Sequence, residues 1–563
     1  MKRLVLLLLT ILLLGAFALP TAALPIDDLT TLAGYFPEGS VIYASARTDD
    51  DFIATLDGVL TQVGQVVPVV GGTTLTQALD LLASGIKSGA TFQDLFRPWL
   101  GNTAAIGMFP LTTTDDFNNP IELVVISITD RDAAEAFFQS VTGPREYVQT
   151  QGDGFTTYES TRDNTHLVFR DDVILIASNF GIVANGGAVA APLTGSVAFN
   201  TALGLLPGSD YNAAVYVDTR AFVSYAADNS VEAFGQPLPA TIAGLEPQAF
   251  GFTIFDGTAL TIEGVSATNV NALGVGSVAT APLDLGLLTR IPAGTPLLIL
   301  GSNFADSYNM VIDQIQQLAS QQGMESDAAD IQTGLWALDF GIRGFTGMNF
   351  QSEILPALNG TYALYAGVNP AAEGADTAFD LVTPDLLLDF ALTFGVTDAA
   401  VAAELRDNLI ATLSALPTER QDNINISFED SNGTQVIVIG VETNSFSGDQ
   451  IELLLGVSDE VFSFGTRRYV EAALNPGVGL DQDPQWQEAA QYYVPESYNI
   501  LYQSSDNLAT LVDIFERTDT SDTRDLSMAL GALTGLVSSS SISYGRLSDG
   551  GMHMRAVLTL NGE

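Results

Sequence analysis

Two short segments of this 563-residue chain have residue types and spacing that enzymes use for nucleophilic chemistry. Residues 84–87 read Ser-Gly-Ile-Lys and fit the pattern S-x-x-K, in which the lysine activates a serine nucleophile. Residues 505–507 read Ser-Asp-Asn, the second element of the same set. The third element, K-T-G, cannot be formed, because the chain has no lysine besides Lys2 and Lys87. We therefore interpret S-x-x-K here as a chance match to a short pattern.

The other side chains that commonly act as nucleophile or base are scarce. The chain has two histidines, His166 and His553, and both lie in segments with the residue pattern of a strand. We interpret each as a residue on a strand face rather than a general base. The chain has no cysteine, which excludes disulfides, thiolate nucleophiles and zinc-thiolate sites. Neither G-x-S-x-G nor a P-loop occurs, so hydrolase and NTPase functions of those types lack support.

Carboxylates remain as candidates for acid–base chemistry, since the chain has 66 aspartates and glutamates. A glycosidase needs two carboxyl groups across a cleft. With this many acids some pair will always be close, so the sequence does not select one. The clusters that stand out are residues 49–51, 115–116 and 171–172, Asp481 with Asp483, and Asp519, Asp522 and Asp525.

Asp481 and Asp483 are the candidate metal ligands. They belong to the segment Asp-Gln-Asp-Pro at residues 481–484, and calcium takes several oxygens from one loop. The segment lacks the glycine and the terminal glutamate of an EF-hand loop, so a solvated loop or helix cap is the interpretation that we favour. No other cofactor is expected.

Helix and strand signals surround these residues. Residues 130–141 and 397–409 each place an aspartate or threonine before an alanine-rich, amphipathic run, which predicts two helices. Apolar runs at residues 121–128 and 386–394 predict the strands that precede them. Phe92, Phe96 and Trp99 recur at i, i+4 and i+7, which predicts one face of a helix packed on a sheet.

The chain repeats itself over long distances. Residues 35–48 read YFPEGSVIYASART, residues 290–303 read RIPAGTPLLILGSN, and in both a proline precedes a turn of small residues and an apolar run. Further pairs of similar segments follow in the same order: residues 92–106 with 350–364, and residues 199–212 with 486–499. We therefore predict a tandem duplication, whose unit is too long for a solenoid repeat.

The expected fold class is α+β, with a mainly antiparallel sheet and packed amphipathic helices in each copy, because strands follow one another through short turns. The predicted division is residues 1–23 as a signal segment, 24–275 as copy one and 282–563 as copy two. Residues 165–169 match 434–438, whereas residues 171–178 match 458–465 at a larger offset. The second copy is therefore expected to carry an inserted hairpin near residues 440–457.

The first residues have the pattern of a secretory signal. Lys2 and Arg3 precede an apolar run from Leu4 to Leu19, and small residues follow up to Ala23. Cleavage after Ala23 is the interpretation that we favour, and an uncleaved membrane anchor is the alternative. We expect an extracytoplasmic location: secreted, periplasmic or on the cell surface.

The formal net charge of −46 limits the partners. It repels the phosphate backbone of nucleic acids and the surface of anionic membranes. We therefore expect no nucleic-acid partner, and contact with a membrane only through the N-terminal segment if that segment is uncleaved. A solvated acidic surface explains most of this charge.

The repeated segments resemble a known family. YFPEGSVIYASART, FQDLFRPWLGNTAAIGMF and LPGSDYNAAVYVD are similar to segments of exported bacterial proteins in the domain-of-unknown-function family numbered 3352. The resemblance covers most of the chain that follows the signal segment. It implies export and a two-part layout, and it carries over no functional residue.

Two functions remain open. The favoured one is a non-catalytic exported protein that binds something or has a structural role in the cell envelope, with a hydrophobic small molecule or an envelope protein as its partner. A cleft between similar units is a common ligand site. The alternative is an extracellular hydrolase with paired carboxylates, one of which must have a raised pKa.

Overall fold

The computed structural model divides the chain into two compact units. Unit 1 comprises Met1–Asn269, Leu547–His553 and Gly562–Glu563, and unit 2 comprises Val270–Arg546 and Met554–Asn561. The structure describes residues 24–66, 74–108, 122–141, 147–161, 165–178, 183, 185–221, 246–255, 259–268, 281–306, 308–309, 312, 325–369, 388–415, 424–444, 449–505, 537–548 and 550–560.

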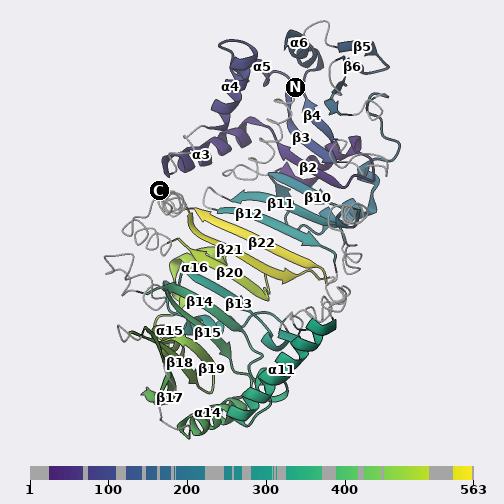
Figure 1. Cartoon of the computed structure of the whole chain (residues 1–563). Helices are drawn as coiled ribbons and strands as arrows, with labels where there is room; N and C mark the ends of the chain where they lie inside the picture. The colour runs from purple at the N-terminus through teal and green to yellow at the C-terminus, as the bar shows by residue number, and fades with distance from the viewer. Residues whose placement is uncertain are drawn as a thin grey trace. The chain divides into compact units, whose positions relative to one another are not determined.

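Unit 1 is built on an antiparallel sheet (Figure 1). The order of its strands is β12-β11-β10-β2-β3-β4-β8-β7-β6-β5. The strands are β2 (Ile42–Arg47), β3 (Leu100–Met108), β4 (Glu122–Ile128), β5 (Tyr147–Gln151), β6 (Thr156–Ser160), β7 (His166–Phe169), β8 (Val173–Ala177), β10 (Ala213–Val217), β11 (Gln248–Phe255) and β12 (Ala259–Ser266). The short strands β1 (Leu24–Pro25) and β9 (Asp210–Tyr211) pair separately.

Several helices of unit 1 begin at capping residues. The side chain of Thr74 accepts a hydrogen bond from the backbone of Gln77, whose own side chain bonds back to Thr74, so that α4 begins with a capping box. The helices are α2 (Ile26–Thr30), η2 (Thr31–Tyr35), α3 (Asp50–Val66), α4 (Leu75–Ile86), α5 (Phe92–Leu95), α6 (Arg131–Val141), η4 (Leu193–Gly195) and α8 (Val197–Gly204).

Unit 2 has its own antiparallel sheet, in the order β21-β20-β13-β14-β15-β19-β18-β17-β16, and β22 forms a hairpin with β21 (Figure 1). The strands are β13 (Leu297–Gly301), β14 (Tyr362–Val368), β15 (Leu388–Gly395), β16 (Ile424–Ser431), β17 (Thr434–Asn444), β18 (Asp449–Val457), β19 (Val461–Thr466), β20 (Asn499–Ser504), β21 (Val537–Arg546) and β22 (Met552–Leu560).

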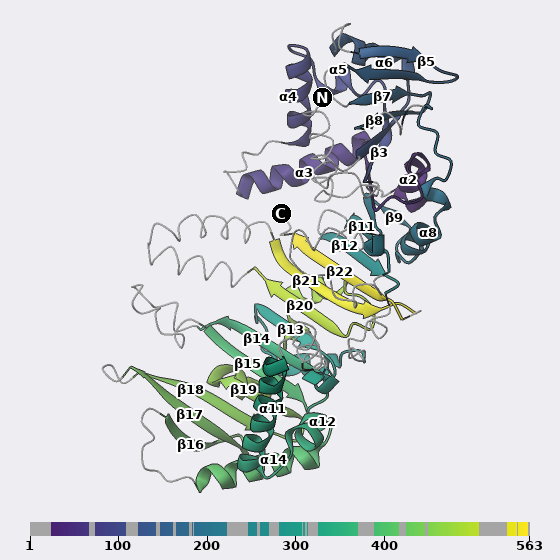
Figure 2. The ribbon, with the colours of Figure 1, turned by 45° about the vertical axis from the view of Figure 1, so that its right-hand side comes forward.

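The two longest described helices of unit 2, α11 and α14, lie against each other (Figure 2). The helices are η7 (Leu285–Arg290), α11 (Glu325–Thr346), the π-helix η8 (Phe350–Ile354), α12 (Leu355–Ala357), α14 (Ala399–Ser414), α15 (Arg467–Leu474), η10 (Leu480–Gln482) and α16 (Pro484–Ala490). The strands and helices together establish the α+β class that the sequence predicted, with an antiparallel sheet in each unit.

The strand order is the same in both units. β13, β14 and β15 occupy the places that β2, β3 and β4 occupy in unit 1, and β19 and β20 correspond to β8 and β10. The segment predicted as an inserted hairpin lies in β17 and β18, which stand where β6 and β7 stand in unit 1. These two strands have 11 and 9 residues, against 5 and 4 in unit 1, so longer strands account for part of the larger offset. The rest arises because residues 434–438 lie in β17, the counterpart of β6, whereas residues 165–169 lie at β7.

The repeated proline segments form equivalent turns. The backbone N–H of Ser40 donates to the carbonyl of Pro37 at 3.0 Å, and that of Thr295 donates to the carbonyl of Pro292 at 3.3 Å. Gly294 has a φ of 76°, a left-handed conformation that glycine adopts without steric cost. The turns lead into β2 and β13, as the sequence predicted.

Each unit packs its own aromatic core. In unit 1 the Phe199 ring contacts Tyr216 at 5.1 Å between ring centroids, and in unit 2 Trp486 contacts Tyr502 at the same distance. Phe199 and Trp486 lie on α8 and α16, and the two tyrosines lie on the equivalent strands β10 and β20. All four side chains are buried, which gives both cores the same edge-to-face anchor.

One predicted helix is shorter than expected. Phe92, Phe96 and Trp99 are all buried, and the Phe96 ring lies 5.6 Å from Phe92 and 5.9 Å from Trp99. The helix α5, however, ends at Leu95, so the prediction of one continuous helical face was wrong. The chain turns after Phe96 to enter β3 at Leu100, and tertiary packing rather than helical periodicity brings the rings together.

Candidate functional site

The residues of the S-x-x-K pattern lie at the end of a surface helix. Ser84 is exposed on α4, and its hydroxyl donates to the carbonyl of Leu81 at 2.9 Å. Lys87 is the exposed C-cap of the same helix. Gly85-Ile86-Lys87 resembles Gly341-Ile342-Arg343, which aligns Ser84 with Phe340. Phe340 is 66% exposed on α11 and stacks on Trp336 at 5.4 Å. The position is therefore a surface position in both units.

Both histidines lie on strands, as predicted. His166 belongs to β7 and His553 to β22, and both side chains are buried. Across the described part of the chain, no three histidine, aspartate or glutamate side chains come together in a way that could hold a metal ion.

Asp483 has a structural role as a helix cap. Its carboxylate accepts hydrogen bonds from the backbone of Gln485 at 2.9 Å and Trp486 at 3.2 Å, which caps α16, and from Gly294 N–H at 2.8 Å. Ser196 caps α8 at the equivalent place in unit 1. Asp481 lies in η10, and its buried Oδ1 has no hydrogen-bond partner among the described residues. Calcium binding by these two aspartates stays a prediction that none of these contacts tests.

The other carboxylate clusters are divided among separate partners where the structure describes them. Asp50 pairs with Arg97 at 2.9 Å, Asp171 with Arg131 at 3.0 Å, and Asp172 accepts a hydrogen bond from Tyr35 at 2.7 Å. Two clusters, residues 115–116 and 519–525, lie outside the described residues.

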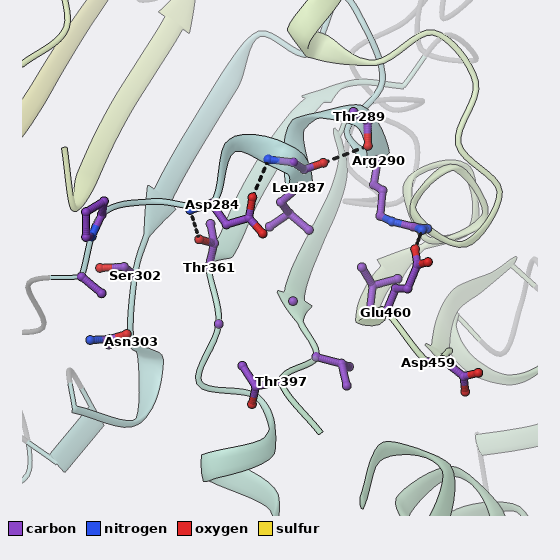
Figure 3. Close-up of a pocket in the computed structure, with 17 residues that line it drawn as sticks. Asp284, Leu287, Thr289, Arg290, Ser302, Asn303, Thr361, Thr397, Asp459 and Glu460 are labelled. Carbon is purple, nitrogen blue, oxygen red and sulfur yellow. Dashed lines mark hydrogen bonds and ion pairs between the residues drawn. The ribbon is translucent and has the colours of Figure 1, made fainter. Parts of the chain in front are cut away.

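A pocket of about 600 Å³ lies at the ends of central strands in the sheet of unit 2 (Figure 3). β13 and β15 end there and β14 and β19 begin there, because neighbouring strands are antiparallel. The helix η7 forms another part of the wall. Antiparallel pairing thus gathers at one place residues that are up to 180 positions apart in the sequence.

Arg290 and Glu460 form an ion pair on one side of the pocket (Figure 3). Arg290 ends η7 and also donates from Nη1 to the carbonyl of Ala473 at 2.9 Å. The arginine side chain is 18% exposed and the glutamate side chain 69% exposed. Burial lowers the pKa of Arg290, and the adjacent carboxylate compensates its charge.

Asp284 and Thr361 connect η7 to the start of β14. The backbone N–H of Asp284 donates to the hydroxyl of Thr361 at 2.7 Å, and the Asp284 carboxylate accepts from Gly286 N–H at 2.9 Å (Figure 3). These bonds use one oxygen of an exposed carboxylate. The second oxygen can accept a hydrogen bond from another donor.

Ser302 and Asn303 follow β13 and form the far side of the pocket (Figure 3). Ser302 is 5% exposed, and its hydroxyl oxygen has no hydrogen-bond partner within the described part of the chain. Asn303 has a φ of 52°, in the left-handed region that asparagine tolerates better than most residues. A buried hydroxyl without a partner costs free energy, and nearly all buried polar groups in folded proteins have a hydrogen-bond partner. The Ser302 hydroxyl is therefore an exception that lies beside a pocket.

Unit 1 makes the equivalent connection with different chemistry. Tyr35 ends η2 just before the Phe36-Pro37 turn, as Arg290 ends η7 before the second proline turn. The Tyr35 hydroxyl donates to Asp172, the residue that precedes β8, and Arg170 lies over the Tyr35 ring at 5.7 Å. Burial, together with the hydrogen bond to Asp172, raises the pKa of Tyr35 to about 12. The connection is common to both units, whereas its side chains are not.

Sequence reasoning did not select these pocket residues. Arg290 and Asn303 are the first and last residues of the repeated segment. The repeat predicted a duplicated fold and did not indicate a binding site. The signal that could have indicated the site is the charged Arg290, which aligns with the aromatic Tyr35 of the first repeated segment. The contribution of Glu460 depends on non-local strand pairing, which the sequence does not display.

The described residues include no helix that is both long enough and apolar enough to cross a membrane. The apolar run Leu4–Leu19 lies outside those residues.

The fold and the pocket define an α+β protein of two units that share one strand order. Comparison with family models identifies it further: residues 4–401 match the model described as Protein of unknown function (DUF3352), and the chain belongs to this family. A search of curated proteins found no match.

Among solved structures, "Structure of crystal form IV of TP0453" is similar to this chain at 10% sequence identity. The alignment covers 43% of this chain and 81% of that one, with a TM-score of 0.23.

Proposed function

We propose that this protein is an exported, non-catalytic binding protein and that the pocket of unit 2 holds a small polar ligand. The observation that carries the proposal is the Ser302 hydroxyl, which is buried at the pocket wall and has no hydrogen-bond partner among the residues that the structure describes. The oxygen has almost no accessible surface, so a rotation of the Ser302 side chain about χ1 would bring it to the pocket, where a polar group of a ligand would satisfy it. A volume of about 600 Å³ is within the usual range for small-molecule sites.

The contacts of the pocket support binding over hydrolysis. A hydrolase needs one carboxyl group with a raised pKa beside a second carboxyl. Glu460 pairs with Arg290, and an adjacent positive charge favours the ionised carboxylate. Asp284 caps η7 through Gly286 N–H. Both acids thus take part in structural bonds, and neither is described as paired with a second carboxyl group.

This ligand class differs from the hydrophobic small molecule that we considered from the sequence. Carboxylates, hydroxyls and an amide form much of the pocket wall, and an apolar cargo would leave them without water or partners. An envelope protein is a second kind of partner, and it would produce no small-molecule adduct in the test below.

Export is proposed from the N-terminal segment, because Lys2 and Arg3 followed by Leu4–Leu19 have the pattern of a secretory signal. The duplication is proposed from two independent features, the repeated segments and the equal strand order of the two units. A single binding unit that was copied accounts for both.

Native mass spectrometry of the full-length protein, expressed with its N-terminal segment in an exporting host and recovered from outside the cytoplasm, tests the proposal. We expect a chain that begins at Leu24 and carries a small polar adduct, which is lost on denaturation. Ser302→Val should lose the adduct while Ser84→Ala, a surface control, keeps it. An apo chain from cells, a lipid adduct, or an adduct that persists in Ser302→Val would contradict the proposed binding site.

A further inference from the structure

The charges around the pocket of unit 2 restrict the ligand that it can take. Three carboxylates and one guanidinium line it: Asp284, Asp459, Glu460 and Arg290. The guanidinium is already paired with Glu460, so no cation among the lining residues compensates the other two carboxylates. An anion would have to displace Glu460 and approach two further negative charges, which is unfavourable.

The pocket wall has a carboxylate oxygen that can accept a hydrogen bond and a hydroxyl that can both accept and donate one. The Ser302 hydroxyl oxygen has no partner among the described residues, although Ser302 is only 5% exposed. The second carboxylate oxygen of Asp284 lies at the centre of the wall, between η7 and β14 (Figure 3). An ammonium group has three donors and no acceptor, and can therefore donate to both of these oxygen atoms.

The pocket also offers apolar surface. Leu287, Val396 and Val461 lie among the polar residues of its wall. They can contact the methylene groups of an alkyl amine while its ammonium group reaches the carboxylates, as the stem of a lysine side chain does on a protein surface.

We propose that the pocket of unit 2 binds a small organic cation, an alkyl amine, through the carboxylate of Asp284 and the hydroxyl of Ser302. This inference rests on the proposed function, because it names the ligand class of the same site. The net charge of −46 raises the concentration of cations near the surface and supports it.

The test is isothermal titration calorimetry on the full chain with three probes of matched length: 1,4-diaminobutane, 1,4-butanediol and succinate. We expect saturable binding of the diamine with a 1:1 stoichiometry and none of succinate. Asp284→Asn should weaken the diamine by about tenfold, the effect of losing one charge-assisted hydrogen bond, because the asparagine oxygen still caps η7. Ser302→Val should weaken it as well.

Glu404→Gln is the matched control, because Glu404 is an exposed carboxylate on α14 that does not line the pocket. The control should bind the diamine as the unmodified chain does.

Equal weakening in Glu404→Gln and Asp284→Asn would show diffuse attraction to an acidic surface and overturn the inference. Tighter binding of the diol or succinate would overturn the choice of a cation and leave the proposed binding site standing. If none of the probes binds, the inference fails, and the adduct observed by native mass spectrometry judges the proposed function separately.

Discussion

At the scale of single residues, a buried ion pair of unit 1 lies at the end of β2. Arg47 is buried at 4% exposure and donates from Nε and Nη2 to the two oxygens of Asp49, each at 2.7 Å. Burial by itself would raise the pKa of Asp49, but hydrogen bonds from Arg47 and from Phe52 N–H outweigh it, and the pKa lies below its ordinary value of 3.8. The buried guanidinium makes the carboxylate necessary, because an unpaired charge in this position is costly.

Asp49→Asn should lower the free energy of unfolding by about 3 kcal/mol at neutral pH, because it replaces the charge that compensates Arg47. The folded pKa of Asp49 is lowered, so its contribution is complete above pH 3.8 and is lost as the pH falls through the folded pKa. Urea titrations at several pH values should therefore show the difference between Asp49→Asn and the unmodified chain shrinking below about pH 4.

Asp51→Asn is the control for this effect, since Asp51 is an exposed neighbour on α3. It should change the free energy of unfolding by less than about 0.5 kcal/mol at every pH. A loss in Asp49→Asn that stays constant down to pH 3 would mean that packing, rather than charge, makes Asp49 important.

At the scale of helices and strands, the two units fix equivalent elements with different side chains. The caps of α8 and α16 are Ser196 and Asp483, and both follow a short 3₁₀-helix. Serine and aspartate are both good N-cap residues because each presents a side-chain oxygen to free backbone N–H groups. The aspartate adds a bond to Gly294 N–H, which ties α16 to the second proline turn.

Asp483→Ser should therefore keep most of the stability of unit 2, whereas Asp483→Ala should lower the free energy of unfolding by about 1–2 kcal/mol. Denaturant unfolding of the two variants, with and without added calcium, measures both effects. If Asp483→Ser is as unstable as Asp483→Ala, and calcium stabilises the unmodified chain alone, the aspartate acts as a metal ligand rather than as a cap.

Local elements were predictable from the sequence where local signals decide them. The helices at residues 130–141 and 397–409 became α6 and α14, with Asp130 and Asp398 accepting hydrogen bonds from their first turns. The pairing of β17 with β18 was not predictable, because residues 434–438 resemble β7 in sequence but occupy the place of β6. Strand register depends on which non-local partner buries each face.

The pocket was unpredictable for the same reason. Its lining comes from strand ends that antiparallel pairing assembles, and Ser302 and Glu460 are ordinary surface-type residues until that pairing is known. Asp481 and Asp483, the metal candidates, stood out because they are close in sequence, which is a local signal that a helix cap produces equally well.

At the scale of the whole molecule, charge is the dominant feature. The chain has 66 aspartates and glutamates and 20 arginines and lysines. Because the acidic residues are in excess, negative charges on the surface repel one another. One arginine can serve more than one acid: Arg467 pairs with Glu429 at 2.7 Å, Glu452 at 3.0 Å and Glu471 at 3.2 Å. Such sharing removes local repulsion, but 20 cations cannot give each of 66 carboxylates a partner of its own.

Added salt should therefore stabilise this protein. Screening shortens the range of repulsion to about 10 Å at 0.1 M salt, and relief of about 1–2 kcal/mol corresponds to a rise in Tm of about 2–3 °C between 10 and 500 mM salt. Calorimetric scans in LiCl, NaCl and KCl should give the same rise, because screening depends on ionic strength rather than on the identity of the cation.

A falling Tm would mean that attractive ion pairs such as those of Arg467 outweigh the general repulsion. A rise that needs millimolar calcium at constant ionic strength would instead identify specific cation binding, which diffuse screening does not produce.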